Sequence, residues 1–170
     1  MRKRGAGAGS KKRVLIICTG NSCRSQMAEG WVRHDLGDQV EVFSAGTHPW
    51  IVHPVAREVM AEAGVDLSGH ASKYVQQFAA EDFDLAITVC DSAREACPAL
   101  PGAKKLLHES IEDPVGLGLD GEEEKEAFRK TRDEIRLSPP GTAEAQRLSS
   151  HWKKGQVLRR RAAEKKDRTP

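Results

Sequence analysis

The chain has 170 residues, which is long enough for one domain with a sizeable core and too short for two. Hydrophobic residues make up 38% and charged residues 31%, and the net charge is +2, as is ordinary for a globular protein. The longest strongly apolar run near the start, residues 14–18, is too short for a signal-peptide core or a membrane span. We therefore expect no membrane partner and a cytoplasmic location, where four cysteines favour catalysis or metal binding over a static disulfide framework.

Both ends of the chain are basic. Residues 1–13 carry six basic groups and no acidic one, and residues 152–170 carry eight basic and two acidic groups, which leaves 13 basic and 23 acidic groups between them. Because aromatic residues that stack on bases are nearly absent from these ends, we interpret them as solvated extensions and expect no nucleic-acid partner. The domain prediction is a disordered basic extension over 1–12, a folded domain over 13–137, and a basic extension over 138–170 that is partly helical or disordered.

Strand and helix patterns alternate between these extensions. Short β-rich or apolar runs predict strands over 13–17, 40–43, 85–89 and 105–107. Helical patterns predict helices over 25–36, 54–63 and 122–137, and a further helix around 143–158. The expected inward residues are Met27, Trp31 and Leu36 in the first helix and Val55, Val59 and Ala63 in the second. The alternation predicts a three-layer α/β fold with a central four-stranded parallel sheet flanked by helices.

The most informative stretch is the polar turn CTGNSCRS, residues 18–25, between the first predicted strand and the first predicted helix. A loop that wraps into a helix N-terminus directs several backbone N–H groups at one point, where the helix dipole adds positive potential. Gly20 permits positive φ and a close backbone approach, and Arg24 can grip two oxygens of a tetrahedral oxyanion. The predicted oxyanion-binding residues are Thr19, Gly20, Asn21, Ser22, Cys23, Arg24 and Ser25.

Cys18, at the start of this loop, is the predicted nucleophile. The positive field of the loop should lower the pKa of its thiol, so that it attacks as a thiolate. Ser25 can add a hydroxyl hydrogen bond to the thiolate, and Asn21 can brace the loop by bonding to backbone groups. The alternative is a buried structural cysteine beside a surface arginine, which the Cys-x5-Arg spacing between a strand and a helix disfavours.

The run CTGNSCRSQMAEG, residues 18–30, resembles the signature of the low-molecular-weight protein tyrosine phosphatase superfamily, and within it the thioredoxin-coupled arsenate reductases. Further matches follow in order: Ser44-Ala-Gly, Cys90 with Cys97-Pro98, Glu112-Asp113-Pro114 and Arg132-Asp-Glu-Ile. The resemblance covers roughly residues 13–137. It implies the fold of this superfamily, arsenate as substrate with phosphate or sulfate as competing anions, thioredoxin as electron donor, and no tightly bound cofactor.

Additional thiols distinguish a reductase from a phosphatase, because phosphate and arsenate are near-isosteric and the loop alone does not separate them. Reducing As(V) on Cys18 requires a second thiol to attack the Cys18 sulfur and a third to move the disulfide outward. Cys90 follows the predicted strand 85–89, so it should lie at the same edge of a parallel sheet as Cys18. The resemblance implies that Cys90 is the second thiol and Cys97 the third.

A bridge between Cys90 and Cys97 makes a geometric demand on the residues between them. If those residues are helical, the two Cα atoms lie about 10 Å apart along the axis. A disulfide tolerates less than about 7 Å. We therefore predict that such a helix unwinds, and that a mobile segment over 90–101 carries the oxidised bridge to the surface for thioredoxin.

Asp113 precedes Pro114, which holds it extended, and it matches the general acid of the family, which protonates a leaving oxygen. The alternative is a plain acidic turn. Phosphatases of the superfamily usually continue Asp-Pro with an aromatic residue, and Val115 stands there instead. This difference favours the reductase.

The potassium site of some family members is matched only in part. Asn21, Glu29 and Ser44 match three of its ligands, but Lys73 stands where an acidic ligand is expected. We predict that the Lys73 ammonium pairs with Glu29 in place of the ion, which would make the enzyme independent of potassium. A zinc site is disfavoured by the Cys-x4-Cys and Cys-x6-Cys spacings, and we interpret Cys23 as structural.

Three hypotheses follow for the function. The first is a monomeric arsenate reductase that takes electrons from thioredoxin. The second is a low-molecular-weight protein tyrosine phosphatase in which Cys90 and Cys97 are incidental. The third is a binding module that senses an oxyanion and would tolerate Cys18→Ser. Motif specificity favours the first.

Overall fold

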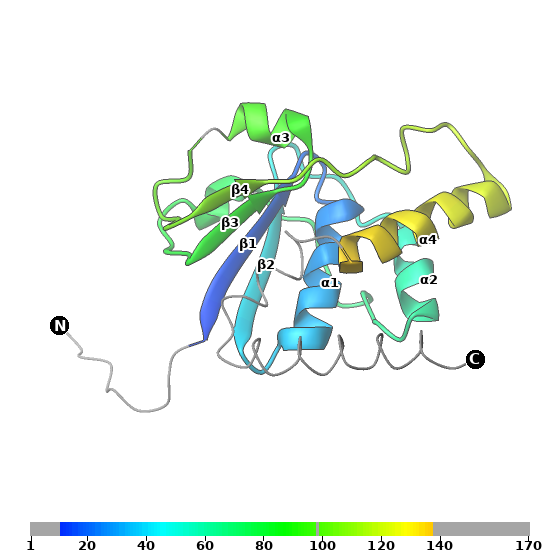
Figure 1. Ribbon diagram of the computed structural model, residues 1–170. Coiled ribbons are helices and arrows are strands. Elements are labelled where there is room, and N and C mark those ends of the chain that lie inside the picture. The colour runs from blue at the N-terminus through cyan, green and yellow to red at the C-terminus, as the bar shows by residue number, and fades with distance from the viewer. Residues whose placement is uncertain (1–10, 98, 138–170) are drawn as a thin grey trace, which may run out of the picture.

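The computed structural model describes residues 11–97 and 99–137 of the chain. Figure 1 shows a sheet with helices grouped around it. The elements in chain order are β1 (Lys12–Cys18), α1 (Arg24–Leu36), β2 (Val40–Gly46), α2 (Pro54–Glu62), the 3₁₀ helix η1 (Val75–Phe78), β3 (Leu85–Thr88), α3 (Asp91–Ala96), β4 (Leu106–His108) and α4 (Gly121–Leu137).

The four strands form one sheet in the order β2-β1-β3-β4, and every pair is parallel. β1 is central and pairs along its whole length with β2, from Lys12 opposite Val40 to Cys18 opposite Gly46. Because the strands are parallel, their carboxyl ends meet at one edge of the sheet. Cys18 ends β1 at this edge, and Cys90 follows β3 there and immediately precedes α3. The predicted α/β fold with a four-stranded parallel sheet is confirmed.

The core lies on both sides of β1 and β3. Residues 14–18 and all of β3 are buried, which explains why these strands are continuous apolar runs in the sequence. Figure 1 shows α1, α2 and α4 grouped together. The buried Trp31 of α1 donates from its indole Nε1 to the carbonyl oxygen of Arg132 in α4 at 3.1 Å, which joins the two helices. Phe78 of η1 packs with Phe43 and Phe83 in an aromatic cluster that belongs to the same core.

The three long helices begin and end within one residue of the predicted bounds. The predicted inward face of α2 packs against the core but is incomplete. Val59 is buried, but Val55 and Ala63 are only partly buried, and Ala56 and Met60 complete the buried face. The reason is that α2 packs against both α1 and α4, so its buried stripe includes neighbours three and four positions apart instead of a single row.

Several sequence predictions concern residues outside the described ranges: the disordered extension over 1–10, the extension over 138–170 with its helix around 143–158, and Pro98 in the segment predicted to be mobile. Lys12 was assigned to the N-terminal extension, but it is the first residue of β1. Its N–H donates to the carbonyl oxygen of Gln39 at 3.3 Å, and it pairs with Val40. No helix within 11–97 and 99–137 combines the length and apolarity that crossing a membrane requires.

Candidate active site

The predicted oxyanion loop, residues 18–25, connects β1 to the first turn of α1. A segment after β2, residues 47–53, holds the carbonyl groups of this loop from outside. Over distances of 2.8–3.2 Å, N–H groups of the segment donate to loop carbonyl oxygens: Thr47 to Cys18, His48 to Thr19, Trp50 to Gly20, and His53 to Ser22. Because the carbonyl and N–H groups of a peptide point in opposite directions, the loop N–H groups are left to face inward, as an anion nest requires.

The loop backbone turns at Asn21, where φ is 45°. Gly20, which permits positive φ, is not among the glycines that adopt it. Asparagine tolerates the left-handed region because its short polar side chain bonds locally. The close backbone approach occurs instead at Gly46, where a Cβ would lie 2.6 Å from the carbonyl oxygen of Thr19. Gly46 is therefore a structural requirement of the loop that the Ser44-Ala-Gly match alone did not reveal.

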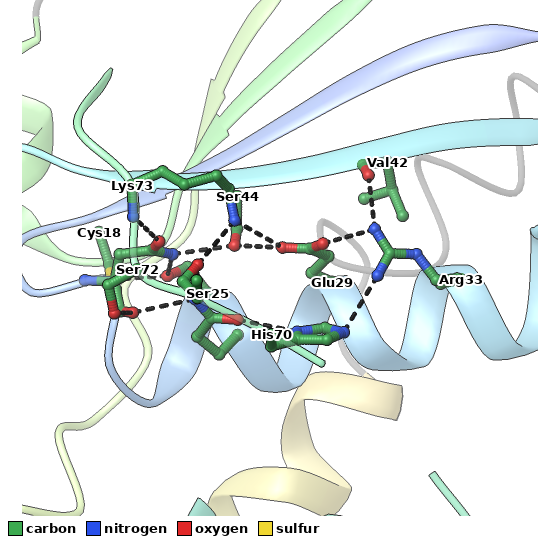
Figure 2. A network of polar contacts seen from close by, with 12 residues as sticks. Cys18, Ser25, Glu29, Arg33, Val42, Ser44, His70, Ser72 and Lys73 are labelled. Atoms are coloured by element: carbon green, nitrogen blue, oxygen red, sulfur yellow. Dashed lines mark hydrogen bonds and ion pairs between the residues drawn. The ribbon is translucent and has the colours of Figure 1, made fainter. Parts of the chain in front are cut away.

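The Cys18 sulfur is buried inside the loop, where two donors surround it. Ser25 Oγ lies 2.8 Å from Cys18 Sγ, and the N–H of Asn21 donates to Cys18 Sγ at 3.1 Å. Asn21 Nδ2 donates to Ser25 Oγ at 2.9 Å, which leaves the Ser25 hydroxyl proton available to the sulfur (Figure 2). Asn21 Oδ1 accepts from the backbone N–H of Lys73 at 2.8 Å. The contacts predicted for Ser25 and Asn21 are thus confirmed.

The pKa of Cys18 does not follow the sequence prediction. Burial raises the pKa of the thiol, and the hydrogen bonds from Ser25 and Asn21 oppose this rise without cancelling it. The prediction of a lowered pKa is therefore wrong for this structure. The physical reason is that burial outweighs the hydrogen bonds that Ser25 and Asn21 make to the sulfur.

A cavity of about 420 Å³, here called the anion hollow, opens above Cys18 and is lined by loop residues together with Trp50, His53, Asp113 and Val115. The side chain of Arg24 is 13% exposed and lies at its wall. Arg24 Nη2 donates to Asp113 Oδ2 at 2.9 Å, and Nη1 donates to the carbonyl oxygen of Ile111 at 2.9 Å. Two residues that are 89 positions apart, both predicted from the sequence, are therefore brought together at this wall.

Two residues that line the anion hollow, Trp50 and His53, were not predicted as site residues. Trp50 is 75% exposed and, with Val115, gives the anion hollow an apolar rim. His53 accepts from the N–H of Val55 at the start of α2 and stacks on Phe128 of α4 at a centroid distance of 4.9 Å. Both residues lie in a loop that shows no hydrophobic periodicity, so no pattern in the sequence identified Trp50. The one available signal was Pro54, whose place as the first residue of a helix makes His53 the N-cap residue.

Cys90 lies beside the oxyanion loop, on the neighbouring strand end. Its Sγ is 3.3 Å from Thr19 Oγ1. A second cavity of about 510 Å³, here called the Cys90 hollow, shares Thr19, Arg24 and Asp113 with the anion hollow. Cys90 is buried and precedes α3, whereas Cys97 follows α3 and is partly exposed. The structure thus places Cys90 at the loop and Cys97 at the far end of one short helix, with all four cysteines as free thiols.

A polar network joins the three buried residues that match potassium ligands of the family, Asn21, Glu29 and Ser44 (Figure 2). Asn21 Nδ2 donates to Ser44 Oγ at 2.9 Å, and Ser44 Oγ donates to Glu29 Oε2. Lys73 Nζ lies 3.8 Å from Glu29 Oε2, and Arg33 donates to Glu29 Oε1 at 2.6 Å. Both carboxylate oxygens already face a cationic side chain, so this donor set does not fit a potassium ion. The predicted pairing of Lys73 with Glu29 is confirmed.

Cys23 precedes α1 and lines the anion hollow from a buried position. Burial raises the pKa of its thiol to about 12. It is therefore a thiol at neutral pH, consistent with the structural interpretation. Across the described parts of the chain, His, Cys, Asp and Glu side chains form no group of three or more that suits a metal ion.

Comparisons with known proteins place these features in a family. The family described as low molecular weight phosphotyrosine protein phosphatase matches residues 13–149, which extends past the predicted domain end at Leu137. The arsenate reductase of Staphylococcus xylosus is 44% identical over 128 residues, covering 75% of this chain and 93% of that protein.

Solved structures agree with this assignment. A structure described as an arsenate reductase in the phosphate binding state has a TM-score of 0.69 at 31% identity, covering 81% of this chain and 99% of its own. The thioredoxin-dependent arsenate reductase of Corynebacterium glutamicum has a TM-score of 0.56 at 31% identity, covering 76% of this chain and 61% of its own. With a family match over most of its length, the chain belongs to the low molecular weight phosphotyrosine protein phosphatase family.

Proposed function

We propose that this enzyme reduces arsenate to arsenite with three of its thiols and is restored by thioredoxin. The observation that carries the proposal is the position of Cys90, whose Sγ lies 3.3 Å from Thr19 Oγ1 in the oxyanion loop. Hydrolysis of a phosphoester on Cys18 needs no second thiol at that position. The sequence relative at 44% identity and the thioredoxin-dependent structural relative support the same reaction.

In the first step, the oxyanion loop holds arsenate through its inward N–H groups and the N-terminal end of α1. Arg24 exchanges its contact with Asp113 for two arsenate oxygens. Cys18 gives its proton to an oxygen of the bound arsenate, the Ser25 hydroxyl and the Asn21 N–H stabilise the resulting thiolate, and the sulfur forms a bond to arsenic. One arsenate oxygen leaves as water and takes a proton from Asp113.

In the second step, Cys90 Sγ attacks Cys18 Sγ. The sulfur–sulfur bond forms, the sulfur–arsenic bond breaks, and its electron pair stays on arsenic, which leaves as arsenite. The two sulfurs lose two electrons, and arsenic changes from As(V) to As(III). Cys97 then attacks Cys90 Sγ, which releases the Cys18 thiolate and leaves a Cys90–Cys97 disulfide. A dithiol of thioredoxin reduces this last bridge and becomes oxidised itself.

The Cys90–Cys97 bridge requires α3 to unwind. α3 spans Asp91–Ala96, and the two cysteines flank it. At the helical rise their Cα atoms lie about 10 Å apart, which exceeds the separation of about 7 Å that a disulfide tolerates. Among the six residues of α3 only Ala93 is buried, so unwinding sacrifices little packing. The partly exposed position of Cys97 would bring the bridge toward the surface.

The test is arsenate-dependent oxidation of NADPH in the presence of thioredoxin and thioredoxin reductase, with phosphate in place of arsenate as the control. We expect wild-type turnover and its loss in Cys90→Ser and Cys97→Ser. Mass spectrometry should find a Cys18–Cys90 disulfide in Cys97→Ser after one turnover.

The other hypotheses predict different outcomes of the same experiment. Aryl phosphate hydrolysis that survives replacement of both Cys90 and Cys97, with no arsenate reduction by the wild type, would identify a tyrosine phosphatase. Oxyanion binding that persists in Cys18→Ser, with no turnover of either substrate by the wild type, would leave an oxyanion sensor.

A further inference from the structure

A chain of three side chains fastens the first residue of α3 to the sheet. His108 ends β4, and its Nδ1 lies 2.9 Å from Thr88 Oγ1 in β3. On the other side of the ring, His108 Nε2 lies 2.9 Å from Asp91 Oδ1. Ser110 Oγ donates to Asp91 Oδ2 at 3.4 Å. We call Thr88, His108 and Asp91 the α3 clasp.

The chemistry of these groups determines which atom donates. A carboxylate only accepts hydrogen bonds, so His108 Nε2 must donate to Asp91. In the neutral ring Nδ1 then accepts from the Thr88 hydroxyl, and in the charged ring Nδ1 donates to the Thr88 oxygen. The α3 clasp can therefore form with either charge state of His108. It connects Asp91, whose side chain is 70% exposed, to the buried Thr88 through a ring that is 20% exposed.

The α3 clasp acts on the Cys90 end of α3. Packing holds this helix weakly, because Ala93 is the one buried residue among its six. Asp91 directly follows Cys90 in the chain. The backbone of Cys90 is extended, and its Sγ lies 3.3 Å from Thr19 Oγ1. A displacement of Asp91 would therefore turn the Cys90 side chain relative to the oxyanion loop.

We propose that His108 is a positioning residue that, through Asp91, holds Cys90 Sγ beside the oxyanion loop for its attack on the Cys18 sulfur. This inference rests on the proposed role of Cys90 in arsenate reduction. His108 acts at a distance from the anion, because the anion hollow is lined by the loop and by Trp50, His53, Asp113 and Val115. Its loss should therefore change the rate of the sulfur–sulfur step and leave anion affinity as it is.

The experiment isolates that step in a Cys97→Ser parent, which stops at the Cys18–Cys90 disulfide and releases at most one arsenite per enzyme. We expect His108→Leu to slow single-turnover arsenite release on the order of fivefold, as for the loss of one partly exposed charged contact. The arsenate concentration that gives half the maximal rate should not change. His108→Gln, whose amide can donate to Asp91, should recover part of the rate.

His34→Leu in the same parent is the matched control, because His34 Nδ1 also lies 2.9 Å from a carboxylate oxygen, that of Asp35 near the end of α1. It should release arsenite at the parental rate. Equal rates in His108→Leu and the parent would overturn the positioning role and leave the proposed function standing. A parent that releases no arsenite would overturn both. If His108→Leu fails to fold, Asp91→Asn weakens the same contact, and a parental rate in that variant would likewise overturn the role.

Discussion

Replacing Ser25 with alanine should make Cys18 a much weaker nucleophile. Ser25 Oγ lies 2.8 Å from Cys18 Sγ and accepts from Asn21 Nδ2, so its own proton is available to the sulfur. Burial raises the pKa of Cys18, and the hydrogen bond from Ser25 is the largest contribution that lowers it. Removing the hydroxyl should therefore raise the pKa of Cys18 further.

The size of the effect follows from the strength of the lost bond. A hydrogen bond to a charged group contributes about 1.5–3 kcal/mol, and about 1.4 kcal/mol corresponds to a factor of ten in an equilibrium. At a pH below the pKa of Cys18, the thiolate fraction in Ser25→Ala should therefore fall roughly ten- to hundredfold. The difference should disappear at a pH high enough to ionise Cys18 in both proteins.

The assay is alkylation of Cys18 by iodoacetamide as a function of pH, with peptide mass spectrometry to separate Cys18 from the other cysteines. Ser72→Ala is the matched control, because Ser72 Oγ donates to the carbonyl oxygen of Asn21 at 2.6 Å instead of to the sulfur. Ser72→Ala should react at nearly the wild-type rate. Alkylation of Cys18 in Ser25→Ala that is as fast as in the wild type would refute the reasoning.

Three further variants test other contacts of the site. Asp113→Asn should free Arg24 from its partner 2.9 Å away, so calorimetry should find phosphate bound about fivefold more tightly while arsenate turnover falls; weaker phosphate binding would contradict this. Replacing sodium by potassium in the buffer should leave the melting temperature of the wild type unchanged. It should raise the melting temperature of Lys73→Asp, because that variant has a second carboxylate beside Glu29. An equal rise in the wild type would contradict the role of the Lys73 ammonium. Burial raises the pKa of Cys23 from 9.0 to about 12, so above pH 9 the unfolded chain releases a proton that the folded chain keeps, and stability is lost as the pH rises. Between pH 9 and 10, urea titration should find that the free energy of unfolding falls by about 1 kcal/mol more in the wild type than in Cys23→Ala; equal losses would contradict the buried thiol.

The features that sequence reasoning predicted well are those with a local or periodic cause. β1 and β3 are buried on both faces, and this alone produces the continuous apolar runs that identified them. The placement of Cys18 and Cys90 at one edge of the sheet followed from the rule that parallel strands end at one edge. These inferences need only the order of elements along the chain.

The features that sequence reasoning missed depend on contacts between distant segments. The pKa of Cys18 depends on how deeply the loop is buried, which the motif does not encode. The ion pair of Arg24 with Asp113 joins residues 89 positions apart, so no local pattern records it. The positive φ belongs to Asn21 and not to Gly20, and the Asn21 side chain is held there by the backbone N–H of Lys73, 52 positions away in the sequence.

Because residues 47–53 hold four carbonyl groups of the oxyanion loop, an arriving anion meets amides that are already oriented. Ordering a backbone residue costs about 1–2 kcal/mol of conformational entropy, and here that cost belongs to folding and is not subtracted from the affinity of each anion that enters. Because arsenate and phosphate have nearly the same shape and charge, the oriented amides bind both and do not distinguish one anion from the other. Under the proposed mechanism, selection between the two anions comes afterwards, from whether the bound atom can accept two electrons.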